Sequence, residues 1–293
     1  MGIQGLNILN INNNIHKDYC PLCTSKNIRS LGKLSCQENT NFSTHEVKLK
    51  NSPEMWRCLR CSSCFVQNTV DAETAKMLYS TGQAGERWST EAFTQNKTRN
   101  VVDSMAAIFI SKGSVLDVGC NTGELLDFAH ALGCKTAGVE FSSASREQLV
   151  KKGHGAYSTL EEAPGGYDVI SAFDLVEHLY DAPAFLQNCR EKLSDNGRLV
   201  ILTGNIGSLS AKLAGSRWWY AQYPEHIIFP SNKFFSEYSG MKIEKWIPTY
   251  ASKGYQFPIY RIVWGILKRL FRSETYTGLP SIGPDHVLVV LRK

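Results

Sequence analysis

The chain has 293 residues, of which 43% are hydrophobic and 20% are charged, and its formal net charge is +5. These proportions are ordinary for a soluble globular protein. Proteins that bind nucleic acid show clustered basic runs interleaved with aromatic residues, and this sequence lacks them, so no nucleic-acid partner is expected.

The sequence also argues against export and against a membrane span. Residues 1–14 lack a basic n-region followed by a long apolar core. No apolar run approaches the ~20 residues that cross a bilayer. Nine cysteines without an export signal indicate reduced thiols or metal ligands rather than disulfides. We therefore expect a cytoplasmic protein.

The first 70 residues predict a tail and a small module. Residues 1–17 are rich in asparagine and predict a frayed tail. Residues 18–70 hold six of the nine cysteines, in which Cys20-Pro-Leu-Cys23 and Cys58-Leu-Arg-Cys61 form two C-x-x-C pairs. Two such knuckles supply the four thiolates of a structural zinc site. Cys64 is an alternative partner, because Cys61-Ser-Ser-Cys64 also fits the spacing, and Cys36 is expected to be a bystander.

A linker of residues 71–93 follows, with a helix over about Ala72–Tyr79 that Asp71 caps. Residues 94–111 predict a helix with an apolar stripe and begin a domain that extends to residue 293. From Ser114 onward the pattern alternates between short apolar strands and helices, which is typical of a doubly wound parallel sheet. The expected elements are strands 115–118, 136–139, 168–173, 198–203, 241–248 and 286–292, and helices 124–132, 143–151 and 183–193.

The most informative segment is Val115-Leu-Asp-Val-Gly-Cys-Asn-Thr-Gly123. A strand, a glycine turn and a helix in succession bring backbone N–H groups up to a ligand. The dinucleotide pattern G-x-G-x-x-G is absent, and a carboxylate at Asp117 would repel a diphosphate. Asp117 instead suits an ammonium group such as that of S-adenosylmethionine, and Glu140 at the next strand end suits ribose hydroxyls.

Residues 94–205 and 286–293 resemble the class I S-adenosylmethionine-dependent methyltransferases, enzymes of class EC 2.1.1. The resemblance rests on the segments 116–123 and 167–179, on Glu140 and on 285–290. It implies a Rossmann-like sheet of seven strands with the last strand antiparallel, preceded by the zinc module as a separate lobe. The residues that it implies as cofactor contacts are Asp117, Gly119, Asn121, Gly123, Glu140 and Phe173.

The whole layout is similar to the nucleotide-sugar methyltransferases, especially the sugar C-methyltransferases, because the two knuckles and the core are joined by the string Tyr223-Pro-Glu-His226. The resemblance does not include the further C-terminal domain of those enzymes. It implies a small sugar-type acceptor in carbohydrate biosynthesis, methylated at oxygen or carbon. The active-site residues that it implies are Tyr79, His178, Tyr223, Glu225 and His226.

His226 is suited to take a proton from a hydroxyl or from a carbon beside a ketone, because the pKa of histidine lies near neutrality. The plain alternative is a structural histidine before the apolar run 227–229. Two other interpretations stay open: a methyltransferase acting on protein or nucleic acid, and a cofactor-binding or zinc-mediated interaction protein. The amphipathic segment 261–272 fits an oligomer contact, a cap on the core or a peripheral membrane contact.

Overall fold

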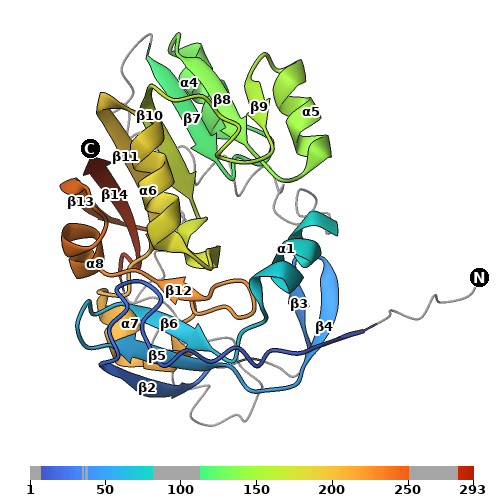
Figure 1. Cartoon of the computed structure of the whole chain (residues 1–293), viewed down its shortest axis with the longest axis vertical. Coiled ribbons are helices and arrows are strands. Elements are labelled where there is room, and N and C mark those ends of the chain that lie inside the picture. Colours follow the sequence, from blue (N-terminus) through green and yellow to red (C-terminus); the bar gives the residue numbers. More distant parts are fainter. Residues whose placement is uncertain (1–7, 35, 37–38, 82–112, 251–282) are drawn as a thin grey trace, which may run out of the picture.

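The computed structural model describes residues 8–34, 36, 39–81, 113–250 and 283–293. Its largest feature is a seven-stranded sheet in the order β13-β14-β11-β10-β7-β8-β9 (Figure 1). The strands are β7 (Ser114–Val118), β8 (Lys135–Val139), β9 (Gly155–Tyr157), β10 (Tyr167–Phe173), β11 (Leu193–Gly204), β13 (Lys242–Thr249) and β14 (His286–Arg292). β7 to β11 pair in parallel, whereas β14 is antiparallel to both β11 and β13. The expected fold, including the reversed last strand, is therefore confirmed.

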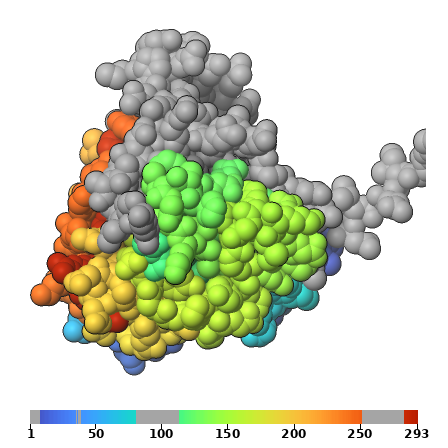
Figure 2. Space-filling model, turned by 90° about the horizontal axis from the view of Figure 1, so that it is seen from above, coloured from blue at the N-terminus to red at the C-terminus, as the bar shows by residue number. Residues whose placement is uncertain are grey.

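Helices cover both faces of this sheet because its strands alternate between two apolar clusters. α4 (Glu124–Ala131) and α5 (Ser143–Lys151) pack with Val115, Val169 and Val200 on one face. α6 (Ala182–Lys192) packs with Leu116, Ile170 and Ile201 on the other. Viewed from above, β7, α4 and the segment through α5 face the viewer, and the N-terminal region shows only at the rim (Figure 2).

The N-terminal region forms two small sheets below the large one (Figure 1). One has the order β1-β4-β3 and the other β12-β6-β5-β2. Their strands are β1 (Leu9–Ile11), β2 (Ile28–Lys33), β3 (Asn39–Phe42), β4 (His45–Leu49), β5 (Glu54–Cys58), β6 (Cys64–Gln67) and β12 (Ile228–Phe229). Because β12 comes from the second half of the chain, one small sheet is built from both the cysteine-rich segment and the methyltransferase-like segment.

Two expectations need correction. Residues 8–17 do not form a frayed tail, because β1 pairs with β4 and the side chain of Asn13 is buried with hydrogen bonds to the backbone of Asn51 and Asn68. The cysteine-rich segment is also not a separate lobe, because β6 pairs with β12. Both errors have one cause: strand partners that are distant in the sequence leave no mark on the local pattern.

Several shorter elements lie outside the expected set: β9, a short helix η1 (Val176–His178), α7 (Leu209–Ala214), η2 (Gly215–Arg217) and α8 (Asn232–Glu237). The expected linker helix is present as α1 (Ala72–Thr81), and Asp71 accepts a hydrogen bond of 2.8 Å from the backbone N–H of Thr74. The predicted helix 94–111 and the amphipathic segment 261–272 lie outside the described residues. Among the helices described, none has the length and apolar character needed to cross a membrane.

Candidate active site and cysteine cluster

The turn after β7 is built from residues in the left-handed region of backbone conformation. Gly119, Asn121 and Gly123 have φ values of 74°, 48° and 81°. The N–H of Gly119 donates to the carbonyl of Val139 at the end of β8, over 2.8 Å. β7 lies between β8 and β10. The strands that follow it along the chain, β8 and β9, lie on one side of it, and β10 and β11 lie on the other side, so the strand order reverses at β7. Such a switch point is where open α/β sheets bind their ligands.

Two carboxylates stand at this switch point. Asp117 is buried at the end of β7, and the Ser171 hydroxyl donates to its Oδ1 over 2.6 Å. Burial raises the pKa of Asp117 to about 7, with the Ser171 hydrogen bond opposing this rise and the charge of Glu140 adding to it. Glu140 accepts 3.0 Å hydrogen bonds from the backbone N–H groups of Asn121 and Ser142. Phe173 ends the neighbouring strand, β10, at the same edge of the sheet.

The residues of the second candidate group meet where this carboxyl edge faces the small sheets. His178 ends η1 after β10, and its Nδ1 lies 2.9 Å from the carbonyl oxygen of Glu225. Nδ1 of His226 lies 2.6 Å from the carbonyl oxygen of Tyr220. A carbonyl only accepts hydrogen bonds, so each ring carries a proton on Nδ1, and a neutral ring with that proton keeps its lone pair on Nε2. The two ring centroids are 4.8 Å apart.

The other three predicted residues surround this pair in different ways. The Tyr79 hydroxyl on α1 lies 3.3 Å from Nδ1 of His178. The carboxylate of Glu225 accepts from the backbone N–H of Ser43, over 3.0 Å. The Tyr223 hydroxyl donates to the carbonyl of Asn68 over 3.3 Å, and burial raises its pKa well above the ordinary value. Tyr79, His178 and His226 are thus brought together. The side chains of Tyr223 and Glu225 instead make these hydrogen bonds to the backbone of the N-terminal region.

Glu177 is a member of this group that the sequence reasoning missed. Its carboxylate is fully buried and accepts hydrogen bonds from the Tyr220 hydroxyl and, over 2.9 Å, from Thr203. One ligand atom from each of Glu177, His178 and His226 lies within 4.8 Å of the others. Attention to Glu177, which stands beside His178 among the apolar residues 175, 176 and 179, would have found it, because an acid seldom enters an apolar core without a partner.

Burial and neighbouring charges set the ionisation of this group. Burial acts to raise the pKa of Glu177, but His178, His226 and the Tyr220 hydroxyl together hold it below the ordinary value. Burial lowers the pKa of His226 to about 3, and His178 adds to this effect while Glu177 opposes it. At neutral pH the site therefore holds an ionised Glu177 beside an uncharged His226.

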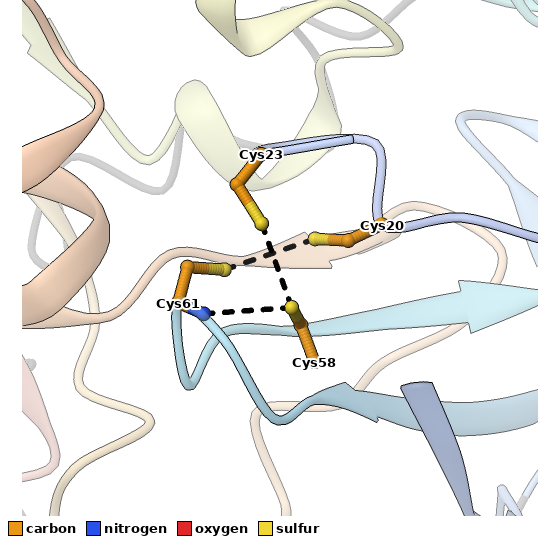
Figure 3. Close-up of side chains that lie close together, drawn as sticks. All are labelled: Cys20, Cys23, Cys58 and Cys61. Atoms are coloured by element: carbon orange, nitrogen blue, oxygen red, sulfur yellow. Dashed lines mark hydrogen bonds between the residues drawn. The ribbon is translucent and has the colours of Figure 1, made fainter. Parts of the chain in front are cut away.

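The four cysteines selected by the knuckle spacing form one cluster (Figure 3). The Sγ atoms of Cys20 and Cys61 are 3.8 Å apart, and those of Cys23 and Cys58 are 3.5 Å apart. A zinc ion with four thiolates at about 2.3 Å requires sulfur–sulfur separations of about 3.8 Å, so the cluster fits zinc. Cys64 stands outside it on β6, where burial raises the pKa of its thiol to about 12. Cys36 is also outside, with its thiol directed at the carbonyl of Tyr223.

Comparison with known proteins names the fold. A family model described as a methyltransferase domain matches residues 91–239, which is half of the chain. The chain belongs to this family. Residues 91–239 thus form a methyltransferase domain of the S-adenosylmethionine-dependent class. The sheet order and the glycine turn of this methyltransferase at the central strand agree with that assignment.

Named relatives match only part of the methyltransferase. A ubiquinone biosynthesis O-methyltransferase of Bradyrhizobium diazoefficiens is 34% identical over 109 residues, covering 34% of this chain and 43% of the relative. The chain thus spans less than half of that relative's length. A methyltransferase of Archaeoglobus fulgidus has a TM-score of 0.48 at 20% identity, covering 76% of this chain and 100% of the other. A chain from the complex of the Haloferax volcanii Trm112 methyltransferase activator with a methyltransferase has a TM-score of 0.51 at 9% identity, covering 69% and 91%.

Proposed function

We propose that this methyltransferase methylates a small acceptor at the group formed by Tyr79, His178 and His226, with His226 as the base. The observation that carries the proposal is the hydrogen bond from Nδ1 of His226 to the Tyr220 carbonyl. With Nδ1 donating to this carbonyl, Nε2 of the uncharged ring is unprotonated, as the acceptor of a proton must be. Tyr79, beside His178, is suited to donate a hydrogen bond to an oxyanion that forms on the acceptor.

S-adenosylmethionine supplies the electrophilic methyl group when it is bound. The groups at the ends of β7 and β8 fit it: the carboxylate of Asp117 suits its ammonium group, that of Glu140 suits its ribose hydroxyls, and the turn 119–123 allows close approach to the backbone. The two sites are adjacent, because Leu175, two residues before Glu177, lies so close to Gly119 that a Cβ there would be 3.3 Å from its Cδ1. Phe173 ends the strand between them.

We propose a sugar-type acceptor, in line with the resemblance of the string Tyr223–His226. The name of the Bradyrhizobium relative favours a second candidate, a ring hydroxyl methylated at oxygen. The two differ in the proton that His226 removes. A carbon acid would exchange with deuterium of the solvent when a non-reactive cofactor analogue is bound, and a hydroxyl acceptor would show no such exchange at carbon.

We further propose that the four-cysteine cluster binds one structural zinc ion, with Cys20, Cys23, Cys58 and Cys61 as ligands. All four positions of a tetrahedral ion are then filled by protein, which leaves no open position for catalysis.

The test begins with a screen of keto and hydroxy nucleotide sugars and of ring hydroxyl compounds for formation of S-adenosylhomocysteine. With an acceptor that is methylated, His226→Ala is expected to lower kcat by roughly 10²–10⁴-fold. Calorimetry is expected to find the same affinity for S-adenosylmethionine as in the wild type. Glu225→Gln is expected to have a smaller effect. A loss of activity that only follows a loss of thermal stability would make His226 a structural residue and refute the proposal.

A further inference from the structure

The second cysteine knuckle lies directly against the segment that follows His226. β12 pairs antiparallel with β6, so that Ile228 is opposite Phe65 and Phe229 is opposite Cys64. The N–H of Val66 donates to the carbonyl of Ile227 over 2.8 Å. Ile227, the residue after His226, is therefore hydrogen-bonded to β6, the strand that follows the knuckle.

Ser231 joins the same segment to the knuckle itself. Its backbone N–H donates to the Ser63 hydroxyl over 3.0 Å, and its own hydroxyl donates to the carbonyl of Cys61, a member of the cysteine cluster. The hydroxyl also accepts from the N–H of Phe234 over 3.0 Å and so caps α8. Ser63 and Ser231 are both buried, so water does not compete for these bonds.

The other side of His226 is held by η1. The N–H of Ile227 donates to the carbonyl of Glu177 over 2.8 Å, and His178 donates to the carbonyl of Glu225 over 2.9 Å. The backbone around His226 is thus hydrogen-bonded to η1 on one side and to the strand and turn of the knuckle on the other. A displacement of the knuckle would tilt this backbone about its η1 attachment and move Nε2 of His226.

We propose that Ser231 is a positioning residue that links the cysteine knuckle to His226, so that zinc bound at the cluster orders the acceptor site. This inference rests on the proposed function of His226 and on zinc at the cluster. Metal binding fixes the fold of a small knuckle that has little apolar core of its own. A shift of about 1 Å at a base is enough to lower a rate by about 10²-fold. Cofactor binding is expected to be insensitive, because the turn 119–123 and Glu140 make none of these contacts.

The chain offers variants that separate this role from simple stability. Ser63→Ala removes the acceptor of the Ser231 N–H, one of the two bonds of the link, and leaves the cap of α8 intact. Ser231→Ala removes the other bond, and Ser231→Thr restores a hydroxyl. Ser239→Ala is the matched control: Ser239 is also buried near α8, but the bonds described for its hydroxyl stay within residues 235–241.

The measurement is hydrogen–deuterium exchange of the peptide covering residues 223–230 in the full chain, with zinc content and S-adenosylmethionine affinity measured in parallel. We expect Ser63→Ala and Ser231→Ala to keep one zinc ion and their cofactor affinity, while amides 226–229 exchange at least tenfold faster. Zinc-free Cys20→Ser should show the same local change, and Ser231→Thr and Ser239→Ala should not.

Where an acceptor is known, kcat should fall with the loss of protection while the KM for S-adenosylmethionine stays constant. The exchange measurement needs no acceptor, so it tests the link through Ser231 even if the screen finds no substrate. The proposed role of His226 as base and the proposed link can therefore be refuted independently. Unchanged exchange over 226–229 in Ser63→Ala, Ser231→Ala and zinc-free protein would overturn the inference. Equal loosening of the whole chain, including the turn 119–123, would overturn it too, because the link would then be a matter of general stability.

Discussion

At the scale of single residues, the site depends on two buried carboxylates whose pKa values shift in opposite directions. Asp117 is buried with one strong hydroxyl donor, and its pKa rises to about 7. Glu177 is buried among two histidines and two hydroxyl groups, and its pKa stays below the ordinary value. The difference lies in the number of groups that favour the charged form, which for Glu177 outweigh desolvation.

Asp117 makes cofactor binding depend on pH. If its carboxylate binds the ammonium group, affinity for S-adenosylmethionine should rise as pH increases from about 5.5 to 7, because the ionised fraction increases, by up to about tenfold per pH unit. An aspartate of ordinary pKa would be ionised throughout this range and give a flat profile. Titration calorimetry at several pH values measures the effect. Asp117→Asn should bind weakly and without this dependence, and a flat wild-type profile would contradict the role.

Glu177 should support catalysis through charge. When His226 takes a proton, a buried cation forms beside the carboxylate, and removing that negative charge raises the barrier. Glu177→Gln is expected to lower kcat by roughly 10–100-fold, which corresponds to about 1.5–3 kcal/mol, with unchanged cofactor affinity. Thr203→Val removes one hydrogen bond to the same carboxylate but keeps the charge, and it should lose less.

Glu177, His178 and His226 also offer three ligand atoms within 4.8 Å, so a cation is the alternative use of the group. Chelation that spares the bound zinc distinguishes the two. If activity disappears on chelation and returns with Mn²⁺, the charge-compensating role of Glu177 is wrong.

At the scale of elements, the glycine turn before α4 shows how local conformation and packing act together. Gly123 has φ of 81°, and a Cβ at this position would lie 2.4 Å from Cδ2 of Leu149 on α5. Gly153 has a similar φ of 88°, with nothing within 4 Å of the added Cβ. Backbone strain is therefore shared by the two positions, whereas the clash is specific to Gly123.

Gly123→Ala is expected to lower the free energy of unfolding by about 1–3 kcal/mol more than Gly153→Ala, which carries the strain alone. Urea unfolding of both variants measures the difference. Gly123→Ala should also weaken cofactor binding, because α4 would have to move away from α5. Equal destabilisation by the two substitutions would mean that Leu149 on α5 can move aside with no loss of stability. Packing against α5 would then not be what requires glycine at position 123.

At the scale of the whole molecule, the cysteine cluster should decide whether the N-terminal region folds. Cys20→Ser is expected to lose zinc and to unfold the small sheets at lower temperature, because the knuckles hold few large apolar side chains. Metal analysis should find about one zinc ion per wild-type chain. Cys36→Ser, outside the cluster, should keep it. A Cys20→Ser protein that lost zinc and kept wild-type stability would refute the structural role.

The sequence alone determined the parts of this protein that local pattern encodes. The run Val115–Val118 followed by Gly119 and Gly123 predicts β7, the turn and α4, because strand and helix periodicity and left-handed glycines act over a few residues. The four knuckle cysteines follow from spacing in the same way. Tertiary structure alone decided that β12 joins β6, that Glu177 is buried beside His226, and that the string Tyr223–His226 is held by the N-terminal region. These contacts join residues that are tens to hundreds of positions apart, and their energy comes from burial and pairing that exist only after the chain has folded.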